Sequence, residues 1–233
     1  MIQQFLQWIL NLLGWNKPQP ASTPPPEPPA YPSSVTYTAT ADVVEITAKP
    51  LIAPHRMIQA IEACFGVLAD EAKTNIGYIA DAMYADNMWR REHVAYTLAT
   101  VYHETAGSWA PVEEAYWLSD PEAYRRKLRY YPWHGRGYSQ LTWESNYLHM
   151  SRVTGYDLIS DPDMAMVPIV AAEVLVYGML SGFYPGAPTL HRYLNDDKTD
   201  FYNARRVVNV LDKAHLISNY AQCIDEQFKK QHV

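Results

Sequence analysis

The chain has 233 residues, a hydrophobic content of 48% and a formal net charge of −6. This length accommodates one domain of roughly 180 residues with an appendage, or two small domains. The negative charge argues against a general nucleic-acid-binding protein, which needs a basic face to meet phosphates. The two cysteines, Cys64 and Cys223, are too far apart to indicate a disulfide framework or a zinc site. We expect both to be small buried hydrophobic residues.

Residues 1–15 are expected to form an amphipathic helix. Glutamine, asparagine and glycine fall on one stripe at helical spacing, and isoleucine, leucine and phenylalanine fall on the other. The stretch is too short and too polar to span a bilayer, and it lacks the basic start and the cleavage site of a secretory signal. We expect a helix that docks on a protein partner or anchors weakly at a membrane. A helix packed on the main domain is the alternative.

Residues 16–53 are expected to be a proline-rich linker followed by an extended segment. Eight prolines lie between Pro18 and Pro32, which favours a semi-rigid extended backbone with little helix or sheet. Residues 35–48 alternate threonine and valine with other residues, as in a short strand. This segment is either a strand or a continuation of the linker.

A mainly α-helical domain is expected over residues 54–233, without a parallel sheet or an internal repeat. Asp120 precedes Pro121 in the pattern of a helix N-cap followed by proline at the first helical position. Thr142 before Trp143 indicates a second cap. The apolar periodicity predicts helices over 55–66, 71–85, 88–105, 120–129, 143–154, 168–181, 201–209 and 213–230.

The predicted helix 88–105 ends with His103 and Glu104. A carboxylate at a helix C-terminus faces the negative end of the helix dipole, which disfavours its charged form. Burial against apolar neighbours would act in the same direction. These conditions suit a general acid that holds its proton near neutral pH. The alternative is an ordinary solvated glutamate at a helix end.

A glycosidase needs a second carboxylate besides Glu104. In an inverting enzyme it lies about 6.5–9.5 Å from the acid, which leaves room for a water molecule. Glu113 and Glu114 follow after a short segment containing glycine and proline, which can fold the chain back. One of them would face a groove, and the other would be solvated or paired with a cation. Asp120 and Glu122 are weaker candidates because both resemble acids at a helix N-terminus.

The segment 133–147 is expected to form a groove wall. Gly135 and Gly137 allow tight turns and the close approach of a ligand, and Arg136 between them could hold a carboxylate through a bidentate pair. The wall carries hydroxyl and amide groups that can bind sugar hydroxyls or position water: Ser139, Gln140, Thr142 and Asn146.

Motifs for cofactors and metals do not match. The glycines at 135 and 137 lack the remaining glycines and the preceding strand of a dinucleotide fingerprint. His103 and Glu104 do not form a His-Glu-x-x-His pair, and there is no Gly-x-Ser-x-Gly elbow. We therefore expect chemistry by carboxylates, without a metal or a cofactor.

Four separated segments, in order and at matching spacing over about residues 55–230, resemble glycoside hydrolase family 19. That family holds plant-type chitinases and many bacteriophage endolysins. The resemblance implies a lysozyme-like, mainly α fold with a substrate groove between two lobes, and an inverting mechanism. It is closer to the peptidoglycan-cleaving branch than to the plant chitinases, which typically carry several disulfides. The segments are AYTLATVYHET (95–105), GRGYSQLTWESNY (135–147), TGYDL (154–158) and ARRVVN (204–209).

The resemblance assigns roles by position. Glu104 matches the general acid, Thr142 matches the residue that helps to hold the attacking water, and Glu114 is favoured over Glu113 as the second carboxylate because it follows a Pro-Val-Glu pattern. Val210 departs from the family, where glycine commonly follows the asparagine, and this puts the placement of Asn209 in question. The residues expected to contact substrate are His103, Arg136, Tyr138, Gln140, Asn146 and Asn209.

The expected function is a phage peptidoglycan hydrolase, either an endolysin or a virion-associated lysin, that acts in the host periplasm or cell wall. The partner is the peptidoglycan glycan strand, and residues 1–15 would tether the enzyme to a phage structural protein or a membrane. The basic cluster Arg125–Arg129 is either a solvated helix face or a contact with an anionic polymer, and the second reading mildly favours peptidoglycan. The alternatives are a chitinase and a non-catalytic wall-binding or structural virion protein.

Overall fold

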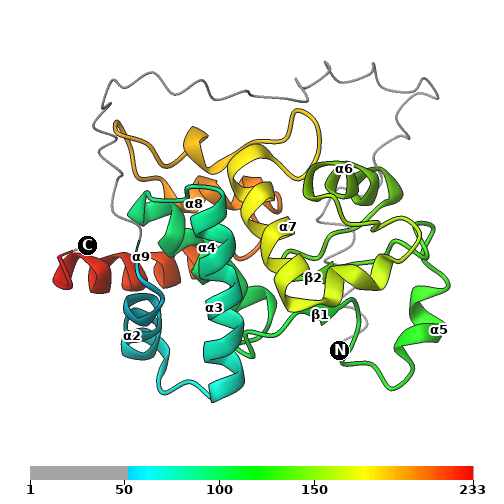
Figure 1. Ribbon diagram of the computed structural model, residues 1–233, viewed down its shortest axis with the longest axis horizontal. Helices are drawn as coiled ribbons and strands as arrows, with labels where there is room; N and C mark the ends of the chain where they lie inside the picture. Colours follow the sequence, from blue (N-terminus) through cyan, green and yellow to red (C-terminus); the bar gives the residue numbers. More distant parts are fainter. Residues whose placement is uncertain (1–51, 233) are drawn as a thin grey trace, which may run out of the picture. The chain divides into compact units, whose positions relative to one another are not determined.

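The computed structural model describes residues 52–232, which belong to one compact unit. The predicted helix 1–15, the linker and the extended segment 35–48 lie outside the described residues. The described part is mainly helical, as the sequence predicts (Figure 1). Its α-helices are α2 (Pro54–Phe65), α3 (Asp70–Ala85), α4 (Arg91–Glu104), α5 (Pro121–Arg125), α6 (Glu144–Thr154), α7 (Pro168–Ser181), α8 (Phe201–Ala204) and α9 (Ala214–Lys230).

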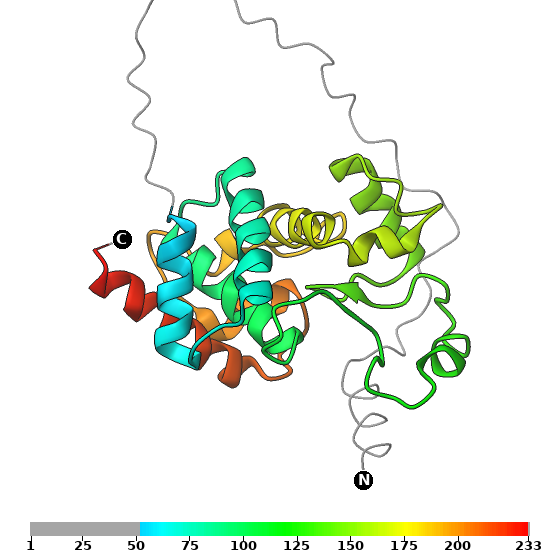
Figure 2. The same cartoon turned by 60° about the horizontal axis from the view of Figure 1, so that its bottom comes forward.

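Helix α4 forms the centre of the domain. All of its residues from His93 to Val101 are buried, so it carries no polar face and its ends alone can reach solvent. It packs most extensively against α9, while α3 packs on α7 and α2 packs on α9. Two views show α2 beside α9 and place α5 on the opposite side of the domain (Figures 1 and 2). The core therefore holds the helix whose last residue is Glu104.

A two-stranded antiparallel sheet supplies the remaining regular structure near the candidate site. Strand β1 (Val112–Glu113) pairs with β2 (Arg136–Gly137), in a register that places Val112 opposite Gly137 and Glu113 opposite Arg136. The sequence predicted a glycine turn here but not the strand pairing. Three short 3₁₀ helices complete the described elements: η1 (Pro162–Met166), η2 (Leu190–Arg192) and η3 (Arg205–Val207).

Helix ends differ from the predictions where local contacts intervene. The predicted helix 120–129 stops at Arg125, and the predicted helix 201–209 changes to 3₁₀ geometry at Arg205. The Asp120 cap is confirmed, because its carboxylate accepts a hydrogen bond of 3.0 Å from the Ala123 N–H. The Thr142 cap is wrong. Trp143 occupies the N-cap of α6 with a φ of 77° and no side-chain cap bond.

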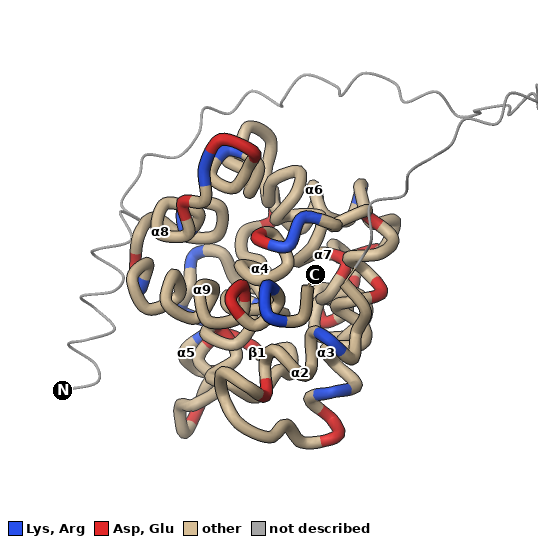
Figure 3. Tube along the Cα trace, turned by 90° about the vertical axis from the view of Figure 1, so that its left-hand side faces the viewer, with Lys and Arg blue, Asp and Glu red and all other residues tan. Residues whose placement is uncertain are grey.

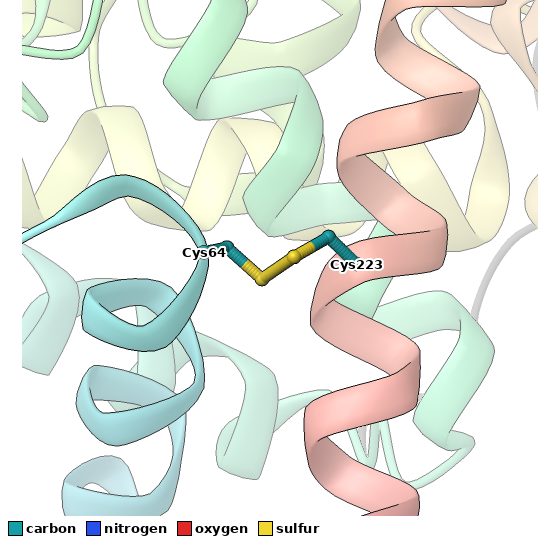
Figure 4. Close-up of a disulfide and its surroundings, with 2 residues drawn as sticks. All are labelled: Cys64 and Cys223. Atoms are coloured by element: carbon teal, nitrogen blue, oxygen red, sulfur yellow. A yellow bond between two sulfur atoms is a disulfide. The ribbon is translucent and has the colours of Figure 1, made fainter.

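Cys64 and Cys223 form a disulfide, which corrects the prediction of two separate buried thiols (Figure 4). The bridge joins α2 to α9 across a sequence separation of 159 residues, with the two Cα atoms 6.0 Å apart. The sequence spacing could not reveal this, since the two cysteines meet only because both helices pack side by side. Cross-linking residues so far apart restricts the unfolded chain strongly.

Charged residues of both signs are interspersed along the described chain (Figure 3). In the part of the chain that the structure describes, no helix is long and apolar enough to cross a membrane. Within the same residues, no group of three or more His, Cys, Asp and Glu side chains could hold a metal ion.

The disulfide yields a prediction for stability. The double substitution Cys64→Ser and Cys223→Ser should lower the free energy of unfolding by about 2–5 kcal/mol, because the unfolded chain regains the entropy of an open loop. Urea unfolding monitored by circular dichroism measures the difference. Dithiothreitol should destabilise the wild-type protein and leave the double variant unchanged. Equal stability of the two oxidised proteins would contradict a constraining role for the bridge.

A second prediction concerns His93, which is buried in α4 with Nε2 2.8 Å from the Leu194 carbonyl oxygen. Burial lowers the pKa of His93 from 6.5 to about 4. Between pH 6.5 and pH 4, His93 therefore binds a proton in the unfolded chain but not in the folded chain. The stability that comes from keeping His93 neutral is fully present above pH 6.5 and is lost as the pH falls toward 4. Relative to His93→Gln, the wild type should lose about 3 kcal/mol between pH 7 and pH 4. Parallel pH profiles of unfolding free energy would contradict this.

Candidate active site

Glu104 closes α4 and forms an ion pair with Arg205, the first residue of η3. One guanidinium nitrogen, Nη1, lies 2.7 Å from Glu104 Oε1, and Nε donates to the Asp212 carbonyl oxygen at 2.9 Å. The Arg205 side chain is 2% exposed and the Glu104 side chain is 17% exposed. Glu104 is partly buried, as expected, but one of its close neighbours is a cation that the sequence analysis did not anticipate. A buried arginine fixes the direction of the carboxylate and leaves part of it accessible.

The residues after Glu104 fix the chain as it leaves the helix. The buried Thr105 hydroxyl donates to the Val101 carbonyl oxygen at 2.8 Å and accepts from the Trp109 N–H at 3.1 Å. Ala106 and Trp109 both adopt positive φ angles, 50° and 60°. Such angles are costly for residues other than glycine and persist only where the surroundings impose them. The turn that follows Glu104 is thus tightly determined.

Glu113 lies among positively charged and imidazole groups. Arg125 Nη1 is 2.6 Å from Glu113 Oε2, His134 Nε2 is 2.6 Å from Oε1, and Arg136 Nη2 is 3.8 Å from Oε1. The Glu113 side chain remains 28% exposed. Glu113 thus combines close cationic and imidazole partners with a side chain that a water molecule can reach.

Glu114, the neighbouring residue, makes a different set of contacts. Its Oε1 accepts from the Tyr130 hydroxyl at 2.9 Å, and its Oε2 accepts from the Gly135 N–H at 2.8 Å. Its backbone N–H and the Gly135 carbonyl oxygen are 2.7 Å apart, which extends the pairing of the two strands. The Glu114 carbonyl oxygen also accepts from Arg125 Nε at 2.7 Å. Glu114 therefore stabilises the hairpin through hydrogen bonds of both its side chain and its backbone.

The prediction of a solvated basic face is wrong for Arg125 but fits the other three cations of the cluster, which are exposed. Arg125 is buried and binds Glu113 and Glu114, as described above. Arg126 pairs with Glu122 at 2.8 Å, and Arg129 lies over the Trp143 ring at 4.8 Å from its centroid. Arg125 is thus the buried member of the cluster, and Arg126, Lys127 and Arg129 are exposed.

Arg136 does hold a carboxylate, but that of Asp163. Its Nε and Nη2 lie 2.9 and 2.8 Å from Asp163 Oδ1. Its Nη1 donates to the carbonyl oxygens of Pro132 and His134 at 2.9 and 3.2 Å. The side chain is 5% exposed. Arg136 is therefore a buried residue whose hydrogen bonds stabilise the hairpin. The prediction that Arg136 contacts substrate is wrong.

Gln140, Thr142 and Asn146 lie in one chain of hydrogen bonds. Gln140 donates from Nε2 to the Val112 carbonyl oxygen at 2.8 Å, Thr142 donates its hydroxyl to the Gln140 carbonyl oxygen at 2.7 Å, and Asn146 donates to the Thr142 carbonyl oxygen at 2.8 Å. All three side chains are half-buried. The Thr142 oxygen keeps acceptor capacity for a water molecule, because a hydroxyl donates once and accepts twice.

Close contacts restrict both glycine positions of the predicted wall, and the backbone contact at Gly137 restricts it most. A Cβ at Gly135 would lie 2.7 Å from Gln140 Oε1, and a Cβ at Gly137, where φ is 84°, would lie 2.9 Å from the Ala165 carbonyl oxygen. Tyr138, next to Gly137, is 0% exposed, and its hydroxyl has no hydrogen-bond partner in the described part of the chain. Tyr138 thus belongs to the core, which corrects the expectation that it contacts substrate.

His103 and Asn209 lie close to the Glu104 ion pair in the chain. Burial lowers the pKa of His103, while the neighbouring Glu104 acts in the opposite direction. The Asn209 N–H donates to the Arg205 carbonyl oxygen at 2.8 Å, and its side-chain Oδ1 accepts from the Val210 N–H at 2.8 Å. Val210 has no positive φ, so the turn here does not need the glycine that is common in the family.

The structure thus brings the predicted residues into two groups. One surrounds Glu104 and includes Arg205 and Asn209, and the other surrounds the β1–β2 hairpin. Sequence reasoning missed Arg205, His134 and Tyr130, and it named Arg125 only as a member of the basic cluster. Arg205 stood in one of the quoted segments, whereas nothing in the sequence signalled His134 or Tyr130.

The Glu104–Arg205 pair yields a prediction. Arg205→Leu should lower the free energy of unfolding by about 3 kcal/mol or more, because it leaves Glu104 without its partner. Adding Glu104→Gln to Arg205→Leu should cost little further. A double-mutant cycle by urea unfolding should give a coupling free energy of at least about 1 kcal/mol. Additive losses would show that the pair does not couple the two segments.

The chain resembles curated plant chitinases over part of its length. An endochitinase from Persea americana is 26% identical over 129 residues, which are 48% of this chain and 39% of the relative. Endochitinase 2 from Gossypium hirsutum is 34% identical over 101 residues, which are 36% of this chain and 33% of the relative. The matches thus span little more than a third of these relatives' length. No family model matches the chain.

A solved structure shares the fold. The crystal structure of a mutant of chitinase C superimposes with a TM-score of 0.50 at 19% identity, and the match covers 76% of this chain and 91% of that chain. At this identity the likeness concerns the fold, and it agrees with the expected lysozyme-like helical architecture. The sequence similarity to endochitinases and the shared fold both agree with the resemblance to glycoside hydrolase family 19 that the motifs indicate.

Proposed function

We propose that the chain hydrolyses glycosidic bonds in a polysaccharide that contains N-acetylglucosamine, by an inverting two-carboxylate mechanism. The observation that carries the proposal is the Glu104–Arg205 pair, in which a partly exposed carboxylate at the end of a buried helix is held in one direction by a buried arginine. The relatives named endochitinases support the substrate class.

Glu104 acts as the general acid. It protonates the oxygen of the leaving sugar as the glycosidic bond breaks, and the developing positive charge on the other sugar is met by water from the opposite face. Arg205 holds Glu104 Oε1, so that Oε2 is the oxygen left to carry and deliver the proton. Positioning a proton donor in this way contributes about 10²–10⁴-fold to a rate.

Glu113, rather than the sequence-favoured Glu114, acts as the base that activates the water. A base needs a charged carboxylate that a water molecule can reach. Glu113 has two close cationic or imidazole partners and an exposed portion, whereas both oxygens of Glu114 accept hydrogen bonds that close the hairpin. Thr142, whose hydroxyl is held by the Gln140 carbonyl oxygen, assists in placing the water.

Within this substrate class, we propose bacterial peptidoglycan as the polymer. The enzyme would be phage-encoded and would act in the host periplasm or cell wall, either as an endolysin or as a virion-associated lysin. The motif segments resemble that branch of the family. The disulfide supports a working place outside the reducing cytosol. The exposed cations Lys127 and Arg129 suit the carboxylates of the peptide stems. Residues 1–15 would tether the enzyme to a phage structural protein or to a membrane.

Chitin is the second candidate, and it is favoured by the names of the sequence relatives, which are endochitinases. Digesting purified sacculi and chitohexaose in parallel, with products identified by mass, separates the two polymers. Release of disaccharide–peptide products from sacculi supports peptidoglycan, and products from chitohexaose alone support chitin. Turnover of neither would favour a non-catalytic wall-binding or virion protein.

The catalytic assignment yields a prediction. Glu104→Gln and Glu113→Gln should each lower kcat by about 10²–10⁴-fold, while Glu114→Gln should mainly lower the melting temperature. The matched control is Glu122→Gln, which removes an exposed acid of the same region. The anomer released at the first turnover, read by proton NMR, should be inverted. Loss of activity in Glu114→Gln at unchanged stability, with Glu113→Gln still active, would overturn the choice of base.

A further inference from the structure

His134 lies at the end of the loop that leads into β2, and it contacts the proposed base directly. Its ring is 2% exposed, and Nε2 is 2.6 Å from Glu113 Oε1. Two hydrogen bonds also fix the backbone of His134. Its carbonyl oxygen accepts from the Tyr147 hydroxyl at 2.8 Å and from Arg136 Nη1 at 3.2 Å. The Tyr131 ring stacks on the imidazole with centroids 5.9 Å apart.

The surroundings of His134 favour a neutral ring. Because Glu113 accepts through its carboxylate, Nε2 carries the hydrogen, and the other nitrogen, Nδ1, is buried without a partner in the described residues. An imidazolium would bury a second N–H at Nδ1 with nothing to accept it, which costs more than an idle lone pair. Burial lowers the pKa of His134. The hydrogen bond to Glu113 and the charge of Glu113 act in the opposite direction, and Arg136 and Arg125 lower this pKa further, so that the net shift is downward.

The charges around Glu113 explain why a neutral donor suits this position. Arg125 contacts Oε2 from α5, and Arg136 approaches Oε1 from β2 while it pairs with Asp163. The Tyr147 hydroxyl accepts a hydrogen bond from Arg136 Nη1 at 3.2 Å. A third cation here would repel the two guanidinium groups, whereas a neutral N–H adds a directed hydrogen bond without adding charge.

We propose that His134 is a positioning residue for the reaction, a neutral Nε2–H donor that fixes Oε1 of Glu113 and keeps this carboxylate charged and aimed as the pH falls. The inference rests on the proposed function, since it takes Glu113 as the base. A hydrogen bond that is made to the charged form of a carboxylate favours that form. His134 thereby sets the acid limit of the pH range in which the enzyme works.

The test compares two amide substitutions of His134. In His134→Gln the amide nitrogen reaches the place of Nε2, and in His134→Asn it reaches only the place of Nδ1, so the pair differs in the bond to Glu113 while both remain polar. The kcat and KM of wild type, His134→Gln and His134→Asn are measured from pH 4 to pH 9 on chitohexaose or solubilised peptidoglycan, whichever the wild type turns over. Melting temperatures are recorded alongside, and rates are taken below the lowest of them.

The expected result separates the two variants. His134→Gln should keep kcat within about threefold of wild type with the same acid limb. His134→Asn should lose about tenfold in kcat at unchanged KM, with the acid limb moved to higher pH by about half a unit to one unit. An unmoved acid limb in His134→Asn, or the same loss in both variants, would overturn the inference. If Glu113→Gln retained full activity, the proposed function would have failed instead, and the two failures are thus distinguishable.

Discussion

The ion pair between Glu104 and Arg205 is the interaction on which the arrangement of the site depends. It joins the end of the central helix to a 3₁₀ turn 101 residues later in the chain, and the arginine is almost completely buried. Buried pairs add little net stability, but the loss of one partner is costly because it leaves an uncompensated charge. Changing either residue alone is therefore costly, and the direction of the Glu104 carboxylate is fixed by its contact with Arg205.

The two candidate carboxylates are held by different means. Glu104 ends a helix whose middle is wholly buried, and the disulfide fastens α9, the main packing partner of that helix, to α2. Glu113 lies on a strand of two residues, where hydrogen bonds from Arg125, Tyr130, Gly135 and Gln140 replace an apolar core. The acid is thus fixed by burial and the hairpin by polar contacts.

The helices were predictable from the sequence because apolar spacing reports which face of each segment is buried, and Asp120 with Pro121 marked a helix start through local chemistry alone. The disulfide was not predictable, since nothing local to Cys64 or Cys223 records that α2 and α9 pack together. Neither were the long-range partners of Glu113. Tyr138 and Arg136 were assigned to a substrate contact because they stood beside Gly137, yet both point into the protein.

Because Glu104 is held by a buried helix and Glu113 by polar contacts, the two carboxylates should differ in local dynamics. Regions with few buried apolar contacts and many partly exposed hydrogen bonds open locally at lower free energy than a packed helix does. Strand β1, whose two residues are only half-buried, comes closer to that description than β2 or α4, whose residues are mostly buried. Positive φ angles at Ala115, Gln140 and Trp143 add strain that only the intact hydrogen-bond set restrains. Local opening would therefore release Glu113 while Glu104 stays in place, so the water-activating half of the site is the one whose geometry depends on polar contacts such as those of Arg125 and His134.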